Sequence, residues 1–503
     1  MIPHPVNKVI VLGGGSAGFM AAIALKVKLP ALQVLVIRSK DIGIIGVGEG
    51  STVPLTKFLH EYLQVGQKKF LEVAQPTWKL GLRFIWGPPQ RPRFFYTFSP
   101  QQPNHVPPEL PRPMAFYCWD DPDYDLPCAL MAQDKAFERS PAGAPIFPNL
   151  AYAYHFENEK FVQFLEAYAT AQGAQILDDT VAHVNQDSAG VTGLLLASGR
   201  TESADLYVDA SGFASLLLGK TLHEPFENFN STLFCDRAVV GGWDRSADEQ
   251  IRPYTTCETM DSGWAWQIEH ENRVNRGYVY SSSFISDETA QQEFRLKNPK
   301  LGPTRIVKFA TGSYQRSWVK NVVAIGNASG FVEPLEATAL GVIAMQSRLL
   351  ADTLLDTNRL PTPSQISGYN DYHRLNWAAI RAFIAVHYKF NTRLDTDFWR
   401  ACREKVELTE MAQRIVDYYR ENGPSRMWEP TLIHSLDQFG LGGYYALLLG
   451  QQVPHQRQYT PSDRELKIWT DRQRKLKQIA DAALTVKQTL ETIRSPRWKW
   501  MTT

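Results

Sequence analysis

The chain has 503 residues, including 53 Lys or Arg and 52 Asp or Glu, so its formal net charge is +1. This length allows more than one domain, and the even balance of charge argues against nucleic acid as a partner, because no field of one sign would attract a polyanion. The five cysteines form no Cys-x-x-Cys pair and are odd in number, which argues against a bound metal and against a disulfide framework.

The first residues, MIPHPVNK, lack the basic and then apolar segments of an export signal. No apolar run approaches the roughly 20 residues that a membrane span needs. Together with cysteines that suit a reducing compartment, these features predict a soluble, cytoplasmic protein with no membrane partner.

The first predicted elements are a strand, a glycine-rich turn and a helix within residues 9–25, VIVLGGGSAGFMAAIAL, followed by a second strand at 32–39. The turn satisfies G-x-G-x-x-G, in which the three glycines permit a tight turn, a close approach of pyrophosphate and close packing of helix on strand. The sequence therefore predicts a dinucleotide site formed by Gly13, Gly15, Ser16, Ala17 and Gly18. The alternative is a glycine-rich turn that only packs.

The second strand ends in Arg38, where an acidic residue usually binds the ribose hydroxyls. An arginine at this place can hold the 2′-phosphate of NADP. On these residues alone, the identity of the dinucleotide stays open.

The pattern of apolar, polar and proline residues changes along the rest of the chain. Residues 86–114 are rich in proline and are expected to form neither a helix nor a central strand. Residues 173–212 and 232–311 have the residue pattern of strands that are separated by turns. Residues 364–425 repeat apolar positions every three or four residues, which predicts amphipathic helices, and a final helix is expected from 463 to 494.

Four further motifs carry a resemblance. They are DIGIIGVGEGSTVP at 41–54, WKLGLRF around Lys79, GWAWQI at 263–268 and VVAIGNASGFVEPLEATALG at 322–341. With the glycine-rich turn, they make the sequence resemble the flavin-dependent tryptophan halogenase family from residue 8 to about 450. The resemblance implies FAD as the dinucleotide, so Arg38 no longer argues for NADP.

The resemblance also implies an architecture. We expect an α/β (α+β) protein with a Rossmann-like FAD-binding flavin monooxygenase fold, mixed sheets and a C-terminal helical module. The FAD-binding module is expected at 1–360, with a substrate-lining excursion at about 86–150. The helical module is expected at 361–503, where it completes the substrate site.

The activity implied is that of an FADH2-dependent halogenase. In this family, reduced FAD and O2 convert chloride or bromide to hypohalous acid, which reaches an electron-rich, indole-type aromatic substrate. Because the chain shows one dinucleotide fingerprint and no second one for a nicotinamide, FADH2 is expected from a separate NAD(P)H-dependent flavin reductase. The resemblance to this family also leads us to expect a homodimer.

Residue roles follow from the same resemblance. Lys79 is expected to hold or steer the hypohalous acid, and Glu336 to take up the proton lost by the ring. The backbone amides of Thr338 and Ala339 are expected to bind halide. Other expected FAD contacts are Ile42, Glu49, Gly50, Val181, Gly326, Asn327 and Leu340. The alternatives are a solvated surface lysine at 79 and ordinary strand-turn packing around 326.

Two tryptophans and a histidine are candidates for the substrate passage. Trp264 and Trp266 alternate in a strand and therefore point to one face, where they either wall the passage or pack as core aromatics. The residue after this motif is Glu269 where the family usually has proline, and the sequence gives no explanation for it. His387 lies on an apolar helix face, where a core histidine is the commoner case.

Departures from the family pattern bear on halide and substrate. The motif that usually reads LESTG is LEATA, so Ala337 lacks a hydroxyl and Ala339 replaces a glycine that permits unusual φ. In residues 442–454, Tyr444 and Tyr445 match members that bind free tryptophan, but Gln451 stands where an acid is expected. A neutral amide does not balance an ammonium group as a carboxylate does.

We therefore expect free tryptophan to be a poor substrate, and indole or a larger indole- or phenol-bearing molecule to be preferred. Two rival functions remain at this point: a flavin-dependent hydroxylase or epoxidase of the same fold, and a non-catalytic flavin-binding member. Lys79 and the paired tryptophans argue against the first, and retention of Lys79 and Glu336 argues against the second.

Overall fold

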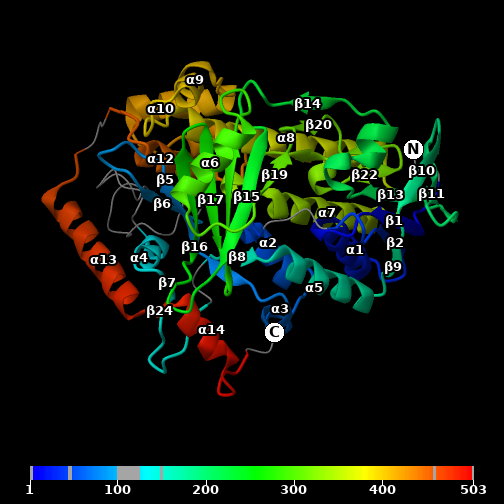
Figure 1. The fold of residues 1–503 in the computed structure, drawn as a ribbon, viewed down its shortest axis with the longest axis horizontal. Helices are drawn as coiled ribbons and strands as arrows, with labels where there is room; N and C mark the ends of the chain where they lie inside the picture. Colours follow the sequence, from blue (N-terminus) through cyan, green and yellow to red (C-terminus); the bar gives the residue numbers. More distant parts are fainter. Residues whose placement is uncertain (1–3, 44–47, 99–124, 148–150, 457–459, 501–503) are drawn as a thin grey trace. The chain divides into compact units, whose positions relative to one another are not determined.

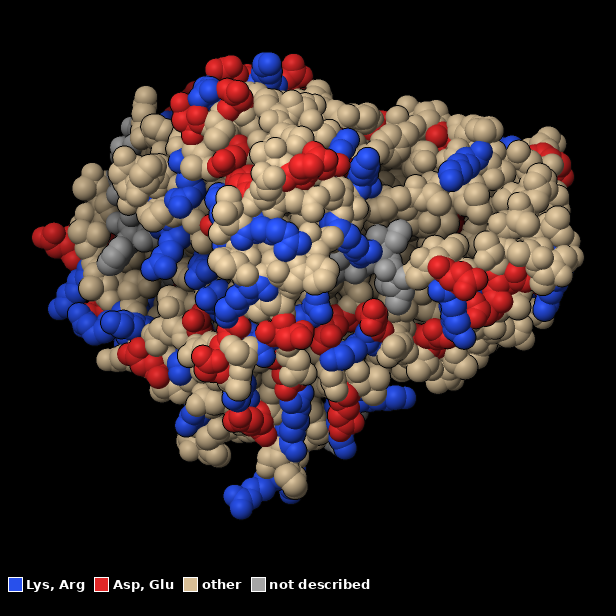
Figure 2. All heavy atoms as spheres, in the orientation of Figure 1, with Lys and Arg blue, Asp and Glu red and all other residues tan. Residues whose placement is uncertain are grey.

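A computed structural model describes residues 4–43, 48–98, 125–147, 151–456 and 460–500. Residues 99–124 and 148–150 of the substrate-lining excursion expected at about 86–150 lie outside these residues. On the face shown in Figure 2, acidic and basic side chains are intermixed, as the balanced composition predicts.

The chain forms two compact units, each assembled from three segments. Unit 1 comprises Met1–Gln75, Phe156–Phe229 and Phe309–Ala378, and unit 2 comprises Pro76–His155, Asn230–Lys308 and Ala379–Thr503. The functional division expected at 360/361 stays a prediction.

Unit 1 is built on a six-stranded sheet in the order β21-β22-β13-β1-β2-β9. Its strands are parallel except for β21, and β1 is almost wholly buried, as expected where helices cover both faces. The bounds are β1 Lys8–Leu12, β2 Gln33–Arg38, β9 Gln175–Asp178, β13 Leu206–Asp209, β21 Trp318–Val319 and β22 Val322–Ala324.

The long helices of unit 1 pack on one another beside this sheet. Helix α1 (Ser16–Lys28) contacts both α5 (Asn158–Ala171) and α7 (Ala339–Asp356), and Figure 1 shows α1 next to β1 and β2. The predicted strand-turn-helix-strand unit at residues 9–39 is therefore confirmed. The shorter elements are β3 Glu49–Gly50, α2 Val53–Lys57, α3 Gln67–Val73, β10 Val181–Asp187, β11 Gly190–Leu196, β12 Thr201–Glu202, β14 Phe226–Asn228, β20 Gly312–Tyr314 and β23 Gly330–Phe331.

Unit 2 is built on a seven-stranded sheet in the order β19-β15-β18-β17-β16-β5-β6. Only the β16–β5 pair is parallel. The bounds are β5 Gly81–Ile85, β6 Phe94–Thr97, β15 Arg237–Asp244, β16 Tyr254–Met260, β17 Gly263–Glu269, β18 Arg273–Tyr280 and β19 Arg305–Lys308. The strands expected at 232–311 are thus confirmed, although α6 (Asp287–Lys297) interrupts them.

A short strand in unit 2 carries the candidate lysine. Strand β4 (Thr77–Lys79) pairs antiparallel with β8 (Ala153–Phe156), so that Thr77 lies opposite His155 and Lys79 opposite Ala153. Paired residues project to the same side of a sheet, and residues two apart in a strand share a face. Thr77, Lys79 and His155 therefore share one face.

The C-terminal part of the chain is helical, as its periodicity predicts. The final segment differs in one respect, because α13 and α14 are separated by a short strand, β24 (Leu484–Thr485), which pairs with β7 (Lys135–Phe137). No helix within the described residues is long and apolar enough to cross a membrane. The C-terminal helices are α8 Pro363–Lys389, α9 Asp397–Lys405, α10 Glu410–Asn422, α11 Glu429–Leu432, α12 Gly440–Gly450, α13 Asp463–Ala482 and α14 Val486–Arg494, and α4 (Leu126–Ala132) lies earlier in unit 2.

Candidate active site

The glycine-rich turn of unit 1 has the shape that a dinucleotide requires. Gly13 has φ +127°, and a β-carbon there would lie 2.2 Å from the backbone oxygen of Ala210. A β-carbon on Gly18 would lie 1.9 Å from the backbone oxygen of Gly13. A β-carbon on Gly15 would meet nothing within 4 Å, and no side chain caps the start of α1. Open space beside an uncapped helix N-terminus fits the pyrophosphate of FAD.

Arg38 at the end of β2 is already paired within unit 1. Its guanidinium donates to the Glu166 carboxylate at 2.6 Å and lies 4.0 Å from the Asp178 carboxylate. A β-carbon on Gly14 would lie 2.4 Å from that of Arg38, so the arginine packs directly on the turn. Its charge is balanced by the protein and needs no 2′-phosphate.

The other expected FAD contacts differ in exposure. Glu49 accepts a hydrogen bond of 2.9 Å from the Asn158 amide, and burial raises the pKa of its carboxyl group. Leu340 is buried in the first turn of α7, Val181 is half-buried, and Ile42 is 70% exposed. A direct role for Ile42 depends on a ligand that covers it.

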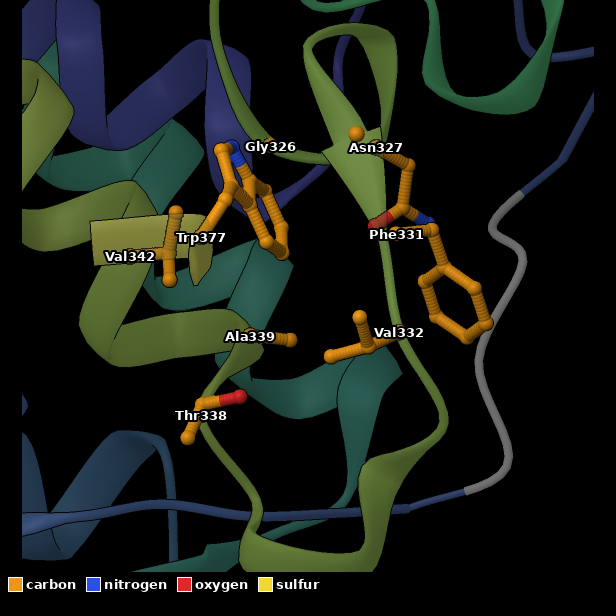
Figure 3. Close-up of a pocket in the computed structure, with 9 residues that line it drawn as sticks. Gly326, Asn327, Phe331, Val332, Thr338, Ala339, Val342 and Trp377 are labelled. Atoms are coloured by element: carbon orange, nitrogen blue, oxygen red, sulfur yellow. The ribbon is translucent and has the colours of Figure 1, made fainter. Parts of the chain in front are cut away.

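A small pocket in unit 1 brings two sets of predicted residues together. It has a volume of about 240 Å³, part of which is open to solvent, and is lined by Gly326, Asn327, Gly330, Phe331, Val332, Thr338, Ala339, Val342 and Trp377. In Figure 3 the Trp377 indole lies between Gly326 and Val342, with Thr338 and Ala339 at the other end of the pocket. Predicted flavin contacts and predicted halide contacts thus line one pocket.

The first turn of α7 reaches this pocket. Thr338 is the N-cap residue, its side chain makes no capping bond, and Ala339 is the first helical residue. The N–H groups of a first helical turn have no partner inside the helix and favour an anion. This end of the helix can therefore accept halide.

The LEATA motif contains one alanine with positive φ, Ala337. Ala337 has φ +53°, in the left-handed region, whereas Ala339 begins α7 and does not have positive φ. Alanine therefore fits position 339 without backbone strain, because the chain turns one step before the helix starts. A non-glycine residue in this region stores backbone strain.

Both carboxylates of the EPLE motif are buried. Glu336 ends a 3₁₀ turn, Pro334–Glu336, and is 2% exposed, while Glu333 is fully buried. Burial suits a group that exchanges a proton with a substrate out of contact with bulk water.

Lys79 is fully buried at the end of β4, which contradicts the alternative of a solvated surface lysine. Its Nζ lies 5.7 Å from the centre of the Phe98 ring. No motif in the sequence marks His155, which is also fully buried, and its Nε2 lies 2.9 Å from the Thr255 hydroxyl, within hydrogen-bond distance. Burial holds the pKa of His155 well below its ordinary value, and the positive charge of Lys79 lowers this pKa further. The imidazole ring is therefore neutral at neutral pH.

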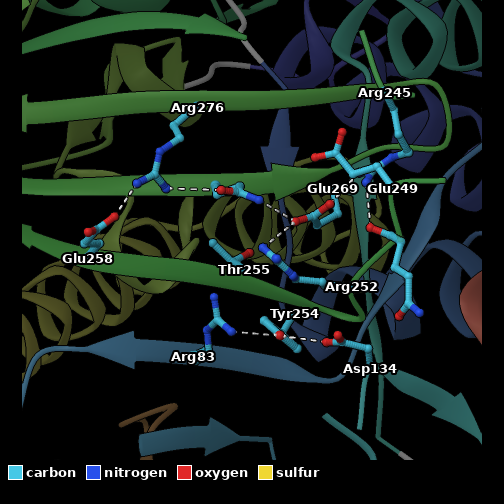
Figure 4. A network of polar contacts seen from close by, with 12 residues as sticks. Arg83, Asp134, Arg245, Glu249, Arg252, Tyr254, Thr255, Glu258, Glu269 and Arg276 are labelled. Atoms are coloured by element: carbon cyan, nitrogen blue, oxygen red, sulfur yellow. Dashed lines mark hydrogen bonds and ion pairs between the residues drawn. The ribbon is translucent and has the colours of Figure 1, made fainter. Parts of the chain in front are cut away.

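Glu269 is the centre of a buried polar network in unit 2 (Figure 4). Its carboxylate, 1% exposed, forms an ion pair with Arg245, lies 3.8 Å from Arg252 and accepts a 2.8 Å hydrogen bond from Gln267. Gln267 in turn accepts from Arg276, which pairs with Glu258. These partners balance and bond the buried carboxylate of Glu269.

The two tryptophans of β17 lie as their alternation predicts. The ring centroids of Trp264 and Trp266 are 6.1 Å apart, and both side chains are buried. The Trp264 ring also packs against Trp86, at 6.5 Å. Within unit 2 these rings form part of an aromatic cluster, and a role as passage walls stays a prediction.

His387 is part of the same aromatic cluster. It is fully buried, its Nδ1 lies 3.0 Å from the backbone oxygen of Phe383, and its ring packs on Phe84, Trp86 and Phe383. These contacts match the core histidine that is the commoner case.

The polar groups expected to hold the head of free tryptophan have partners inside unit 2. The Tyr444 hydroxyl donates to the Asp437 carboxylate at 3.2 Å, and the Tyr445 hydroxyl donates to the backbone oxygen of Ser425 at 2.8 Å. The Gln451 amide donates to the backbone oxygen of Val386 at 3.3 Å.

Comparison with known proteins decides the family. The chain matches the sequence model described as Tryptophan halogenase over residues 8–464. It belongs to the tryptophan halogenase family. It is 31% identical over 448 residues to tryptophan 7-halogenase KtzQ of Kutzneria sp. (strain 744), with 84% of this chain and 83% of KtzQ covered.

Solved structures agree with this assignment to the tryptophan halogenases. MibH, described as a lathipeptide tryptophan 5-halogenase, has a TM-score of 0.87 and 34% identity, with 98% of this chain and 94% of MibH covered. Xcc4156, a flavin-dependent halogenase from Xanthomonas campestris, has a TM-score of 0.84 and 27% identity, with 98% of each chain covered. The chain is therefore a flavin-dependent halogenase that acts on tryptophan-type aromatic substrates, with the expected mixed α/β fold and C-terminal helices.

Proposed function

We propose that this halogenase acts on an indole-type substrate other than free tryptophan. The observation that carries the proposal is Gln451, which stands where family members that act on free tryptophan have an acid. Its side-chain amide and the hydroxyls of Tyr444 and Tyr445 already bond to groups of the protein. An ammonium group placed there would lack a carboxylate to balance it.

The likeness to MibH supports a larger substrate. MibH is described as a lathipeptide tryptophan 5-halogenase, and a tryptophan inside a peptide has neither a free ammonium nor a free carboxylate group. Indole lacks both groups as well. A peptide-borne or otherwise substituted indole is therefore the substrate class that we favour.

We assign the following roles to the residues of the chain. The first turn of α1 would bind the pyrophosphate of FAD, and the backbone at Gly326 and Asn327 would contact its ring. When bound, reduced FAD supplies two electrons, with which O2 oxidises a halide to hypohalous acid. The backbone amides of Thr338 and Ala339 hold the halide.

The remaining roles concern hypohalous acid and the aromatic ring of the substrate. The amine of Lys79 holds or steers hypohalous acid, which would otherwise react without selectivity. The aromatic carbon displaces hydroxide from the halogen and then loses its proton, which the carboxylate of Glu336 accepts. FADH2 comes from a separate NAD(P)H-dependent flavin reductase.

The test uses the full chain with a flavin reductase and NADH. Indole, free tryptophan, a tryptophan-containing peptide and phenol are each offered with chloride and then with bromide, and products are read by mass spectrometry. We expect halogenated indole or halogenated peptide at least tenfold faster than halogenated tryptophan. Faster turnover of free tryptophan would overturn the substrate assignment, and oxygenated products that form without halide would favour the hydroxylase alternative.

A further inference from the structure

One buried side chain of unit 1, Gln346 in α7, contacts the turn that lines the candidate flavin and halide pocket. It is fully buried and lies about two helical turns beyond Thr338 and Ala339. No motif in the sequence assigns it a role.

Gln346 closes a ring of hydrogen bonds with the turn Gly326–Ser329. Its Oε1 accepts the backbone N–H of Gly326 at 2.7 Å, and its Nε2 donates to the Ser329 hydroxyl at 2.8 Å. That hydroxyl donates to the backbone oxygen of Gly326 at 2.8 Å. The turn needs an acceptor and a donor on one group, and a carboxamide supplies both.

The turn has little freedom to move. Gly326 has φ +65°, and a β-carbon there would lie 3.1 Å from both the Ala17 and the Ile343 side chains. The turn is therefore packed between α1, which carries the dinucleotide fingerprint, and α7. The two hydrogen bonds of the Gln346 side chain join this turn to α7.

Gln346 also contacts the third segment of the pocket. Its backbone oxygen accepts a 3.3 Å hydrogen bond from the Tyr369 hydroxyl in α8. Trp377, about two turns further along α8, lines the pocket. The turn, α7 and α8 are the three segments that line the pocket. Gln346 belongs to α7 and forms hydrogen bonds with the other two.

We propose that Gln346 is a positioning residue that sets the pocket between the Gly326–Ser329 turn and the start of α7 to the width that flavin and halide require. This inference rests on the proposed function of that pocket. It assigns Gln346 no contact with substrate, and it requires the side chain at 346 to be neutral, because a buried charge there would repel a neighbouring anion.

The test compares two substitutions with a matched control. Gln346→Met keeps the length of the side chain and removes both hydrogen bonds. Gln346→Glu keeps an acceptor for Gly326 and adds a negative charge. Ser347→Ala is the control, since Ser347 is the next residue, is fully buried and has no hydrogen-bond partner for its hydroxyl among the described residues.

The first readout is the Kd for FAD, measured by flavin fluorescence at a temperature where circular dichroism shows each variant folded. The second is the KM for bromide with the aromatic substrate that wild type turns over fastest. We expect Gln346→Met to raise the Kd for FAD at least tenfold. Gln346→Glu should recover most of the FAD affinity yet raise the KM for bromide at least tenfold, and Ser347→Ala should match wild type in both.

A purely structural role gives a different pattern. If Gln346→Met melts at a lower temperature but, while folded, binds FAD and bromide like wild type, Gln346 is no positioning residue and the inference fails alone. If wild type itself binds no FAD, the proposed function fails and the inference fails with it.

Discussion

The hydroxyl of Thr77 donates a hydrogen bond to the backbone oxygen of Glu269, although the two residues lie 192 positions apart in the sequence. Thr77 begins β4, the strand that ends in Lys79, and Glu269 ends β17. The strand that carries the candidate lysine is therefore joined to a buried ion network of unit 2. This hydrogen bond attaches the start of β4, two residues before Lys79, to the end of β17.

Glu269→Ala should destabilise the protein strongly. It leaves Arg245, whose side chain is 4% exposed, without its carboxylate partner, and an unpaired buried charge costs about 3 kcal/mol or more. Glu271→Ala is the matched control, because its pair with Arg494 is partly exposed and such pairs contribute about 0–1 kcal/mol. Urea unfolding of both variants measures the difference, and equal losses of unfolding free energy would contradict the central place of Glu269.

The sequence predicts local features of the fold and site well. The apolar run before Gly13 and the spacing of Gly13, Gly15 and Gly18 indicate the first strand, turn and helix, because each depends on neighbours in sequence. Lys79 was identified from its motif, and its complete burial agrees with a functional role.

Features that depend on distant partners could not be predicted. Glu269 was unexplained because its partners lie across strands, with Arg245 24 residues away and Thr77 192 away. Gln346 shows no pattern in sequence, since its role arises only when a turn 20 residues earlier packs beside it. The left-handed φ of Ala337 was missed because alanine gives no sign of a conformation that it rarely adopts.

Lys79→Met should abolish halogenation while leaving FAD bound. Methionine fills a similar volume in the buried site but cannot hold hypohalous acid. We expect the rate of halogenated product to fall at least about 100-fold, the scale of a lost acid–base or oxidant-holding group. The Kd for FAD should stay within about threefold of wild type, because we assign Lys79 no contact with FAD. Mass spectrometry and flavin fluorescence measure the two effects, and product formation near the wild-type rate would remove Lys79 from the mechanism.

Gly277→Ala should displace the Trp266 ring. Gly277 of β18 lies opposite Trp266 of β17, and a β-carbon there would lie 2.0 Å from a ring carbon. Such overpacking costs about 1–3 kcal/mol, so the unfolding free energy should fall and tryptophan fluorescence should change. Gly193→Ala is the control, since its β-carbon would make contacts of 3.4 Å or more. A variant at 277 with wild-type stability and fluorescence would contradict this packing.

Asp437→Asn should remove a pH dependence of stability. Burial raises the pKa of Asp437 to about 6, although its carboxylate accepts hydrogen bonds from the backbone of Phe439 and Gly440 and from Tyr444. The ordinary value is 3.8, so the folded state binds the proton more tightly than the unfolded state does. The contribution of Asp437 to the free energy of unfolding is therefore fully present below about pH 4 and is lost as pH rises through about 6.

Asparagine cannot ionise, so the unfolding free energy of Asp437→Asn relative to wild type should increase by about 2 kcal/mol between pH 4 and pH 8. Urea unfolding across that range measures it, and a difference that stays constant with pH would show that Asp437 is ionised at its ordinary pKa in the folded protein.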